Sequence, residues 1–211
     1  VLEGTWKPTA TDGSGRDRAT LKAALDLLQE AGFSLKDRVL VDASGQPATF
    51  EIMTKNEDEE KLALAYSRGL ELIGIKASVR TVDPSQFEER RIKFDFDMVF
   101  YTWAASLSPG GEQVGRWSQK AAETPGSLNI TGASEPAIDA LIEAMVAARS
   151  REDFVSAVRA LDRVLISGAY AVPLFHPPAE WLGQWIRIAA PATFPLYGYE
   201  FPTWWSAKPG N

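Results

Sequence analysis

Residues 48–82 constrain the fold of this chain most, because a strand pattern, a helix pattern and a second strand pattern follow one another with short connections. Residues 48–54 form the first strand pattern. Asn56 can cap a helix whose apolar side chains recur at helical spacing until Gly74, and residues 75–82 then alternate apolar and polar side chains. Such a unit pairs its strands in parallel with a right-handed crossover. The sequence therefore predicts an α/β fold with a parallel sheet.

Further elements are predicted on both sides of this unit. Asp17 can cap a preceding helix that ends near Gly32, and residues 38–42 are β-like. Asp83 followed by a proline begins another helix. Residues 97–103, DMVFYTW, are β-branched or aromatic without alternation, which is typical of a strand covered on both faces. We expect that strand to lie in the centre of the sheet.

Residues 104–133 show no convincing periodicity. Loops longer than about 12–15 residues are uncommon in compact domains unless they are functional or disordered, and this one keeps aromatic and amide side chains. We therefore expect a functional loop. Two amphipathic helices follow, opened by Ser134 and Ser150, and Gly168 ends the second. Residues 170–175 predict a last strand.

Composition excludes several function classes. With 28 acidic and 22 basic residues the formal net charge is −6, whereas a nucleic-acid-binding surface needs clustered positive charge. The lack of cysteine and the single histidine, His176, leave too few ligands for zinc, and a serine hydrolase would need that histidine as its base. The sequence contains no phosphate-binding glycine motif and no run of 18 apolar residues. We expect no cofactor, no metal and no nucleic-acid partner.

A candidate binding site begins at the carboxyl end of the strand predicted over residues 97–103, where open α/β sheets place their ligands. The indoles and hydrogen-bonding groups there suit non-covalent binding of a polar organic molecule such as a peptide or a sugar. The alternative is that the two tryptophans anchor the loop in the core and the polar residues form turns. The candidate ligand-binding residues are Trp103, Ser106, Glu112, Gln113, Trp117 and Asn129.

Two charged features have less specific interpretations. Glu112 and Asp139 can be imagined as the carboxylate pair of a hydrolase, but among 28 carboxylates chance proximity is the better account. The run Glu88-Glu89-Arg90-Arg91 has balanced charge on a short predicted helix, and we interpret it as a solvated face.

The end of the chain has an unusual composition. Residues 176–211 carry six of the 13 prolines and four of the seven tryptophans. This segment is too apolar for a solvated linker and too rich in proline for a helix or a central strand. We expect it to pack on a surface that this chain does not contain.

Several long segments, in order, resemble a known family. They are LALAYSRGLELIGIKASVRTVD, FDFDMVFYTW and SLNITGASEPAIDALIEAMVAARSREDFVSAVRALDRVLISGAYAVPLFH, within a match over about residues 18–205. They resemble the second lobe of family 5 extracellular solute-binding proteins, the peptide-type periplasmic receptors of ABC importers. The segments SPGGEQVGRWSQKAAETPGSLNITG and RALDRVL resemble the oligopeptide/microcin C-binding subgroup.

The resemblance implies the second lobe of a type II periplasmic-binding fold, with a mixed sheet flanked by helices. Residues 1–17 would be a linker from the missing first lobe, residues 18–176 the second lobe, and residues 177–211 a segment returning toward the first lobe. The protein would not be an enzyme. It would be periplasmic or extracytoplasmic, with its signal segment outside this chain, and would bind a peptide or peptide-like ligand for a membrane ABC permease. An oligosaccharide receptor of the same fold, or a hydrolase using Glu112, is the alternative.

The resemblance also bears on single residues. It places Trp103 and the following Ala104-Ala105-Ser106 at the cleft. Receptors of this type commonly have an aspartate there that pairs with the ligand's amino terminus, and its absence leaves Glu112 as the nearby carboxylate that could replace it. Asn129 matches a recurrent asparagine that could hydrogen-bond a peptide backbone. Gln113 and Trp117 are further expected contacts.

Overall fold

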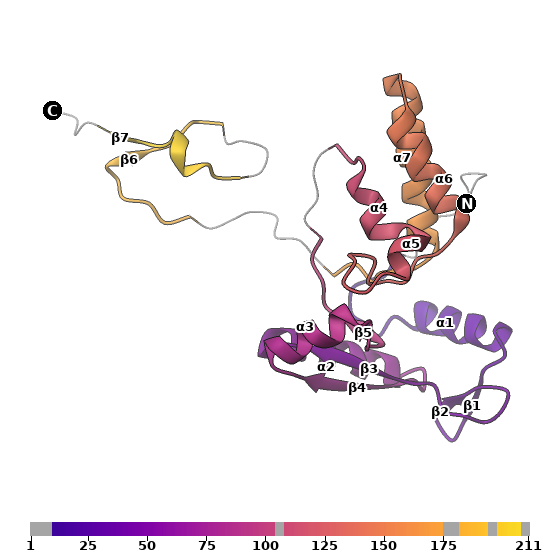
Figure 1. The fold of residues 1–211 in the computed structure, drawn as a ribbon. Coiled ribbons are helices and arrows are strands. Elements are labelled where there is room, and N and C mark those ends of the chain that lie inside the picture. The colour runs from indigo at the N-terminus through magenta and orange to yellow at the C-terminus, as the bar shows by residue number, and fades with distance from the viewer. Residues whose placement is uncertain (1–9, 104–107, 175–181, 194–197, 208–211) are drawn as a thin grey trace. The chain divides into compact units, whose positions relative to one another are not determined.

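The computed structural model describes residues 10–103, 108–174, 182–193 and 198–207 (Figure 1). The chain divides into two compact units, Val1–Val172 and Pro173–Asn211, and each is described by itself. Among the described residues, no helix combines the length and the apolar character that crossing a bilayer requires.

The first unit contains a three-stranded parallel sheet in the order β4-β3-β5. Strand β3 (Thr49–Thr54) lies in the centre and pairs along its whole length with β4 (Lys76–Thr81). Helix α2 (Glu57–Glu71) connects these two strands. The predicted strand–helix–strand unit, and with it the α/β fold, is confirmed.

Local chemistry explains where α2 begins and where the chain turns after it. The Asn56 side chain accepts a hydrogen bond from the Glu59 backbone N–H at 2.9 Å, which caps the helix. Gly74 has φ of +81°, and a Cβ there would lie 2.6 Å from Leu35 Cδ1 and 2.8 Å from the Leu40 backbone nitrogen. Only glycine fits this turn without displacing its neighbours.

Alternate residues of β3 enter two different hydrophobic clusters. Ile52 packs with Ala63 of α2 and Ala77 of β4. Met53, which is fully buried, packs instead with Phe87 of helix α3 (Pro84–Ile92). The sheet is therefore covered by α2 on one face and by α3 on the other, as parallel sheets generally are.

Strand β5 (Met98–Val99) corrects one expectation. Within the described residues it pairs only with β3, so it lies at an edge of the sheet and not in its centre. Met98 packs on the α2 side and Val99 on the α3 side. Coverage of both faces explains the unbroken apolar pattern, but it does not specify how many strands flank the segment.

A hairpin of β1 (Ser34–Lys36) and β2 (Val39–Val41) precedes the sheet. The second strand was predicted and the first was not. The two-residue turn between them, Asp37 and Arg38, has φ of 48° and 67°. Such left-handed turns are usually marked by glycine or asparagine, so the sequence signal was weak. Helix α1 (Arg18–Glu30), capped by the predicted Asp17, precedes the hairpin.

The described residues of the first unit include four further helices. They are α4 (Glu112–Trp117), α5 (Gln119–Ala122), α6 (Pro136–Ala147) and α7 (Arg151–Ser167). Helices α6 and α7 pack against each other around Ile138, Ile142, Met145 and Leu161, which we call the helical core. The segment predicted as one long loop therefore includes two short helices.

The starts and ends of these elements agree only partly with the predictions. Ser150 caps α7 as predicted, accepting from the Asp153 N–H at 3.0 Å. Ser134 does not open α6, which follows Glu135 without a side-chain cap, because Pro136 at the first position needs no partner for an N–H. Residues 170–174 form no strand, and Pro173 among them has no N–H to donate to a ladder. Phe175 lies outside the described residues.

The second unit contains a short antiparallel pair, β6 (Ile188–Ala189) with β7 (Trp205–Ser206), and a 3-10 turn, η1 (Phe201–Thr203). The Trp204 ring packs against Phe201, with ring centroids 5.1 Å apart. Large apolar side chains remain exposed: Ile186 is 100% exposed and Trp185 is 74% exposed.

Candidate ligand-binding site

Four rings in the first unit form a continuous series that we call the aromatic row: Tyr101, Trp103, Trp117 and Tyr170. Successive ring centroids lie 5.3, 5.5 and 6.4 Å apart. Tyr101 and Trp103 follow β5, Trp117 ends α4, and Tyr170 follows α7. The row therefore connects the carboxyl edge of the sheet to the helical core, and it includes both predicted tryptophans.

The two tryptophans are held differently. Both are half-buried. The Trp103 indole N–H donates to the Leu128 carbonyl at 3.5 Å, which is long for a hydrogen bond. Trp117 packs against the helical core. Trp117 thus has a clear anchoring role, whereas Trp103 lies at the edge of the sheet where a ligand would be met.

The strands β3 and β4 end together at this same edge. The hydroxyls of Thr54 and Thr81, which are register partners, lie 2.9 Å apart, and Thr54 is fully buried. The next residue, Lys55, places its ammonium 4.9 Å from the Phe87 ring centroid. The ends of the two strands are therefore joined by a partly buried hydrogen bond, and a cation lies beside them.

Glu112 and Gln113 lie at the start of α4, close to each other. The Glu112 carboxylate accepts from the Gly110 N–H at 3.0 Å and from the Gln113 amide at 3.1 Å. Hydrogen bonds from its own backbone N–H, from Gly110 and from Gln113 hold the pKa of Glu112 below its usual value. An exposed carboxylate held in its ionised form can pair with a ligand cation but is poorly suited to donating a proton.

Asn129 is buried, with 1% exposure, and its amide is fully used by its own loop. The NH₂ group donates to the carbonyls of Ser118 at 2.9 Å and Ala133 at 2.8 Å. Its carbonyl accepts from the Ala133 N–H and the Thr131 hydroxyl. These bonds fill the capacity of the side chain. The geometry therefore supports a structural role for Asn129 rather than the predicted contact with a peptide.

Ser106, with Ala104 and Ala105, lies outside the described residues, so its expected place at the cleft stays a prediction. Asp139, the imagined partner of Glu112 in a hydrolase, accepts from the Gln119 backbone N–H at 3.3 Å from both carboxylate oxygens. The described hydrogen bonds of Asp139 thus hold the start of α5, whereas those of Glu112 hold the start of α4.

The solvated face predicted for residues 88–91 is wrong for its two arginines. Their side chains are only 17% exposed at Arg90 and 12% exposed at Arg91. Phe87, which is buried, lies three and four positions before them, so all three share one helix face. That spacing is the sequence signal that would have identified these arginines as part of the packed structure.

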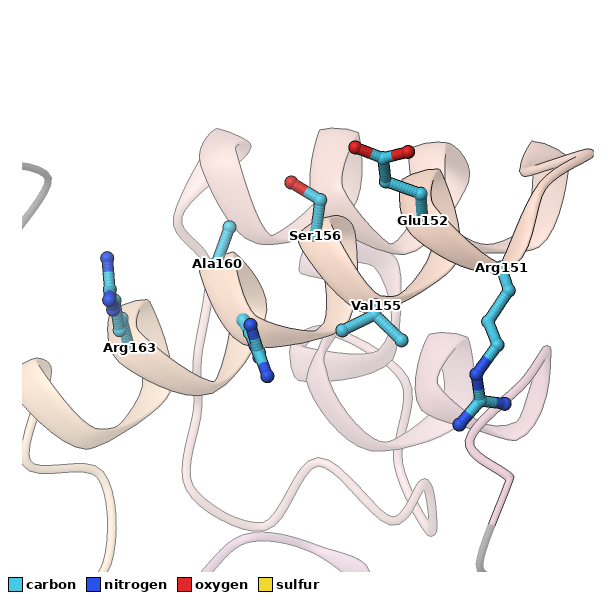
Figure 2. Close-up of a pocket in the computed structure, with 7 residues that line it drawn as sticks. Arg151, Glu152, Val155, Ser156, Ala160 and Arg163 are labelled. Carbon is cyan, nitrogen blue, oxygen red and sulfur yellow. The ribbon is translucent and has the colours of Figure 1, made fainter.

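A shallow concavity lies elsewhere, on the outer face of α7. Figure 2 shows its lining side chains projecting from successive turns of that helix. The described lining residues are Arg151, Glu152, Val155, Ser156, Arg159, Ala160 and Arg163. All belong to one helix and none belongs to the aromatic row. Within the described part of the chain, no cluster of residues could hold a metal ion.

Comparisons with known proteins identify the family and the fold. Residues 2–124 match the family described as bacterial extracellular solute-binding proteins, family 5 middle. A putative binding protein of Brucella suis biovar 1 is 54% identical over 97% of this chain and 33% of its own length. The peptidoglycan-binding protein YepA of Agrobacterium fabrum is 45% identical over 99% of this chain and 34% of its own length. The chain thus spans about a third of these relatives.

A solved structure shows the fold. The oligopeptide-binding protein AppA of Bacillus subtilis, in complex with a nonapeptide, superposes with a TM-score of 0.70 at 21% identity, over 89% of this chain and 37% of that one. The fold is that of periplasmic binding proteins, as the sequence predicted. The chain belongs to the family 5 extracellular solute-binding proteins of bacteria, because the family match covers more than half of it.

Proposed function

We propose that the complete gene product is a periplasmic or extracytoplasmic receptor that captures peptides or peptide-like compounds and delivers them to a membrane ABC permease. The observation that carries the proposal is the aromatic row, whose first two rings follow β5 at the carboxyl edge of a parallel sheet. The solved complex of AppA with a nonapeptide supports the ligand class.

In this proposal each site residue has a different task. Trp103 stacks on the ligand, because its side chain is only partly buried and its own hydrogen bond is weak. Gln113 offers amide hydrogen bonds, and the ionised Glu112 offers a partner for a ligand cation. Ser106 is a further proposed contact. Trp117 holds the row against the helical core.

The proposal also includes a second half of the site. Relatives are about three times as long as this chain, so we propose that a first lobe closes over Trp103 and that residues 177–211 return to it. Ligand would then be bound between two lobes, and its preference for the closed state would drive closure. The ligand leaves unchanged, because an exposed Glu112 with a lowered pKa is a poor general acid.

A second ligand class is favoured by one relative. YepA, which is 45% identical, is named a peptidoglycan-binding protein. Peptidoglycan fragments combine amino sugars with short peptides, and a series of aromatic rings suits the flat faces of sugars as well as peptide side chains. Among carbohydrate-containing ligands, we therefore place peptidoglycan fragments ahead of plain oligosaccharides.

The test is a binding screen of the complete gene product by native mass spectrometry and thermal shift. Three pools are compared: synthetic peptides of two to ten residues, peptidoglycan fragments, and neutral oligosaccharides. We expect binding from the first or second pool, and a Trp103→Ala variant that loses it while melting near the wild-type temperature. Binding from the oligosaccharide pool alone, or chemical conversion of a bound ligand, contradicts the proposal.

A further inference from the structure

Arg90 and Arg91, two adjacent arginines of α3, differ in how many hydrogen bonds their guanidinium groups donate. Arg90 donates from Nε to the carbonyl and carboxylate of Asp95 at 2.9 and 3.1 Å, and from Nη1 to Glu51 at 2.9 Å. Arg91 donates from Nε to the Glu88 carboxylate at 2.6 Å. Its Nη1 is buried and has no hydrogen-bond partner.

An unused donor on a buried cation is costly. Leaving a buried polar group without a hydrogen bond destabilises the folded protein, and more so when the group is charged. Such groups are rare in native structures and each calls for an explanation. Glu88 does not remove the cost, because it meets the guanidinium at Nε alone and its side chain is 54% exposed. The Arg91 group therefore has capacity for a further acceptor.

The surroundings of Arg91 join it to the candidate site. The next residue, Ile92, accepts a hydrogen bond from the Gly126 N–H at 2.9 Å. Two residues further along that loop, the Leu128 carbonyl accepts from the Trp103 indole. The hydrogen bond to Glu88 raises the pKa of Arg91, and Tyr101 of the aromatic row acts in the same direction. The end of α3 is thus packed against the segments that hold Trp103.

The chemistry of the missing acceptor can be specified. A guanidinium presents its donors in a planar fork that fits a carboxylate with two parallel hydrogen bonds. The side chain as a whole is 12% exposed but Nη1 itself is buried, so a ligand carboxylate would reach this donor only with a local shift of the atoms that cover it. A ligand carboxylate would accept hydrogen bonds and would also bring a negative charge to the guanidinium. Glu88 does this only at Nε. A neutral sugar hydroxyl would supply neither the charge nor the paired geometry.

We infer that Arg91 is a specificity-determining residue that pairs with a carboxylate of the bound ligand beside Trp103. This inference rests on the proposed capture of peptides or peptide-like compounds. In such ligands the carboxylate belongs either to the carboxyl terminus or to an acidic side chain. The two sources share the same chemistry and are separated by the experiment.

The experiment uses the complete gene product and synthetic peptides of two to ten residues. Peptides retained by the wild type are identified by mass spectrometry. Each is then compared by calorimetry with two altered forms, one amidated at the carboxyl terminus and one with Asp and Glu replaced by Asn and Gln. We expect one of these changes to weaken binding about ten- to a hundredfold, in line with a charge-assisted hydrogen bond.

Variants of the two arginines test whether Arg91 causes the preference for a carboxylate over its neutral form. In Arg91→Met the carboxylate and its neutral form should bind about equally, whereas Arg91→Lys should keep part of the preference. Arg90→Met is the matched control, because its donors are already taken by Glu51 and Asp95. It should lower the melting temperature and leave the carboxylate preference unchanged.

The outcomes separate this inference from the proposed function. If the wild type binds no peptide, the proposed function fails and the inference fails with it. If the wild type binds peptides but does not distinguish carboxylate from amide, or if Arg91→Met keeps the preference, only the inference is overturned. If Arg91→Met melts well below the wild type without ligand and its preference persists, the acceptor is another part of the protein. Should Arg91→Met not fold, Arg91→Lys decides by the same comparison.

Discussion

Trp103 and Trp117 lie with ring centroids 5.5 Å apart and planes inclined by 31°, although they are 14 positions apart in the chain. One ring belongs to the edge of the sheet and the other to the helical core. The contact places the sheet edge beside helices that come later in the sequence, and it makes the two indoles neighbours with different tasks.

Replacing each tryptophan by alanine should separate those tasks. In the complete gene product, Trp103→Ala should weaken ligand binding by about 1–3 kcal/mol with little change in stability, as for buried aromatic anchors at interfaces. Trp117→Ala should lower the free energy of unfolding by about 2–4 kcal/mol, because it removes packing from the helical core. Urea unfolding and calorimetry measure both effects. Equal affinity with reduced stability in Trp103→Ala would make Trp103 a core residue.

Asn129 should matter for stability. Asn129→Ala leaves the Ser118 and Ala133 carbonyls and the Ala133 N–H without this partner, so we expect a loss of about 2–4 kcal/mol. Ser127→Ala is the control, because the Ser127 hydroxyl makes fewer bonds to the same loop. Thermal unfolding ranks the variants. An Asn129→Ala protein as stable as the wild type, with weakened ligand binding, would restore the contact role predicted from the sequence.

Gly74 and Gly69 offer a matched pair of glycines. Gly74→Ala should destabilise the protein by about 2 kcal/mol or more, because φ is positive and the new Cβ meets backbone and side-chain atoms. Gly69 lies inside α2 with nothing within 4 Å of an added Cβ, so Gly69→Ala should stabilise by about 0.5–1 kcal/mol. Denaturant midpoints measure both changes. Similar effects at the two positions would contradict the geometry described for the turn after α2.

Glu112 should make a pH-dependent contribution to stability, and the sign of that dependence is known. Its pKa is lowered in the folded protein from an ordinary value of 4.5, so its bonds to Gly110 and Gln113 contribute fully only well above pH 4.5. The contribution then declines as the pH falls through the folded pKa. Hydrogen exchange at the Gly110 amide should show protection that is lost on acidification. Glu112→Gln should remove this step, and a step that instead appears above pH 6 would show that the pKa is raised.

The second unit should cause self-association when the 211-residue chain is studied alone. Trp185 and Ile186 are 74% and 100% exposed, and contiguous apolar surface of this kind promotes association. Sedimentation should show concentration-dependent self-association, which Ile186→Ser reduces. Ile166→Ser on α7, 45% exposed in the first unit, is the control. In the complete gene product, Trp185 fluorescence should be shielded from quenchers, and a monomeric chain with Trp185 already shielded would contradict the proposed return to a first lobe.

Local signals predicted the first unit well because its elements are fixed by neighbours in sequence. Asn56, Asp83 and Ser150 cap the helices that they were expected to cap. Strand order was not predictable in the same way, since burial on both faces looks alike in a central strand and in the edge strand β5. Helix α6 begins at Pro136, so Glu135 occupies its cap position and Ser134 lies one residue too early to cap it.

The sequence named Trp103 and Trp117 as candidate contacts, which stays a prediction. It could not show that the ring of Tyr170 joins them, because that contact forms only through the fold. Asn129 was predicted as a contact because it matches a recurrent asparagine of the family that the sequence resembles, whereas here its amide hydrogen-bonds backbone groups of its own loop. The partial burial of Arg91 was missed because charge balance was weighed above its spacing from Phe87.

The hydrophobic cluster around α6 and α7 shares no residue with the two clusters that cover the sheet, and the aromatic row runs from one to the other. The first unit therefore contains separately packed hydrophobic clusters joined by the tilted and edge-on ring contacts of the aromatic row. A ligand bound beside Trp103 would bridge these clusters, so that binding would make the whole lobe more rigid.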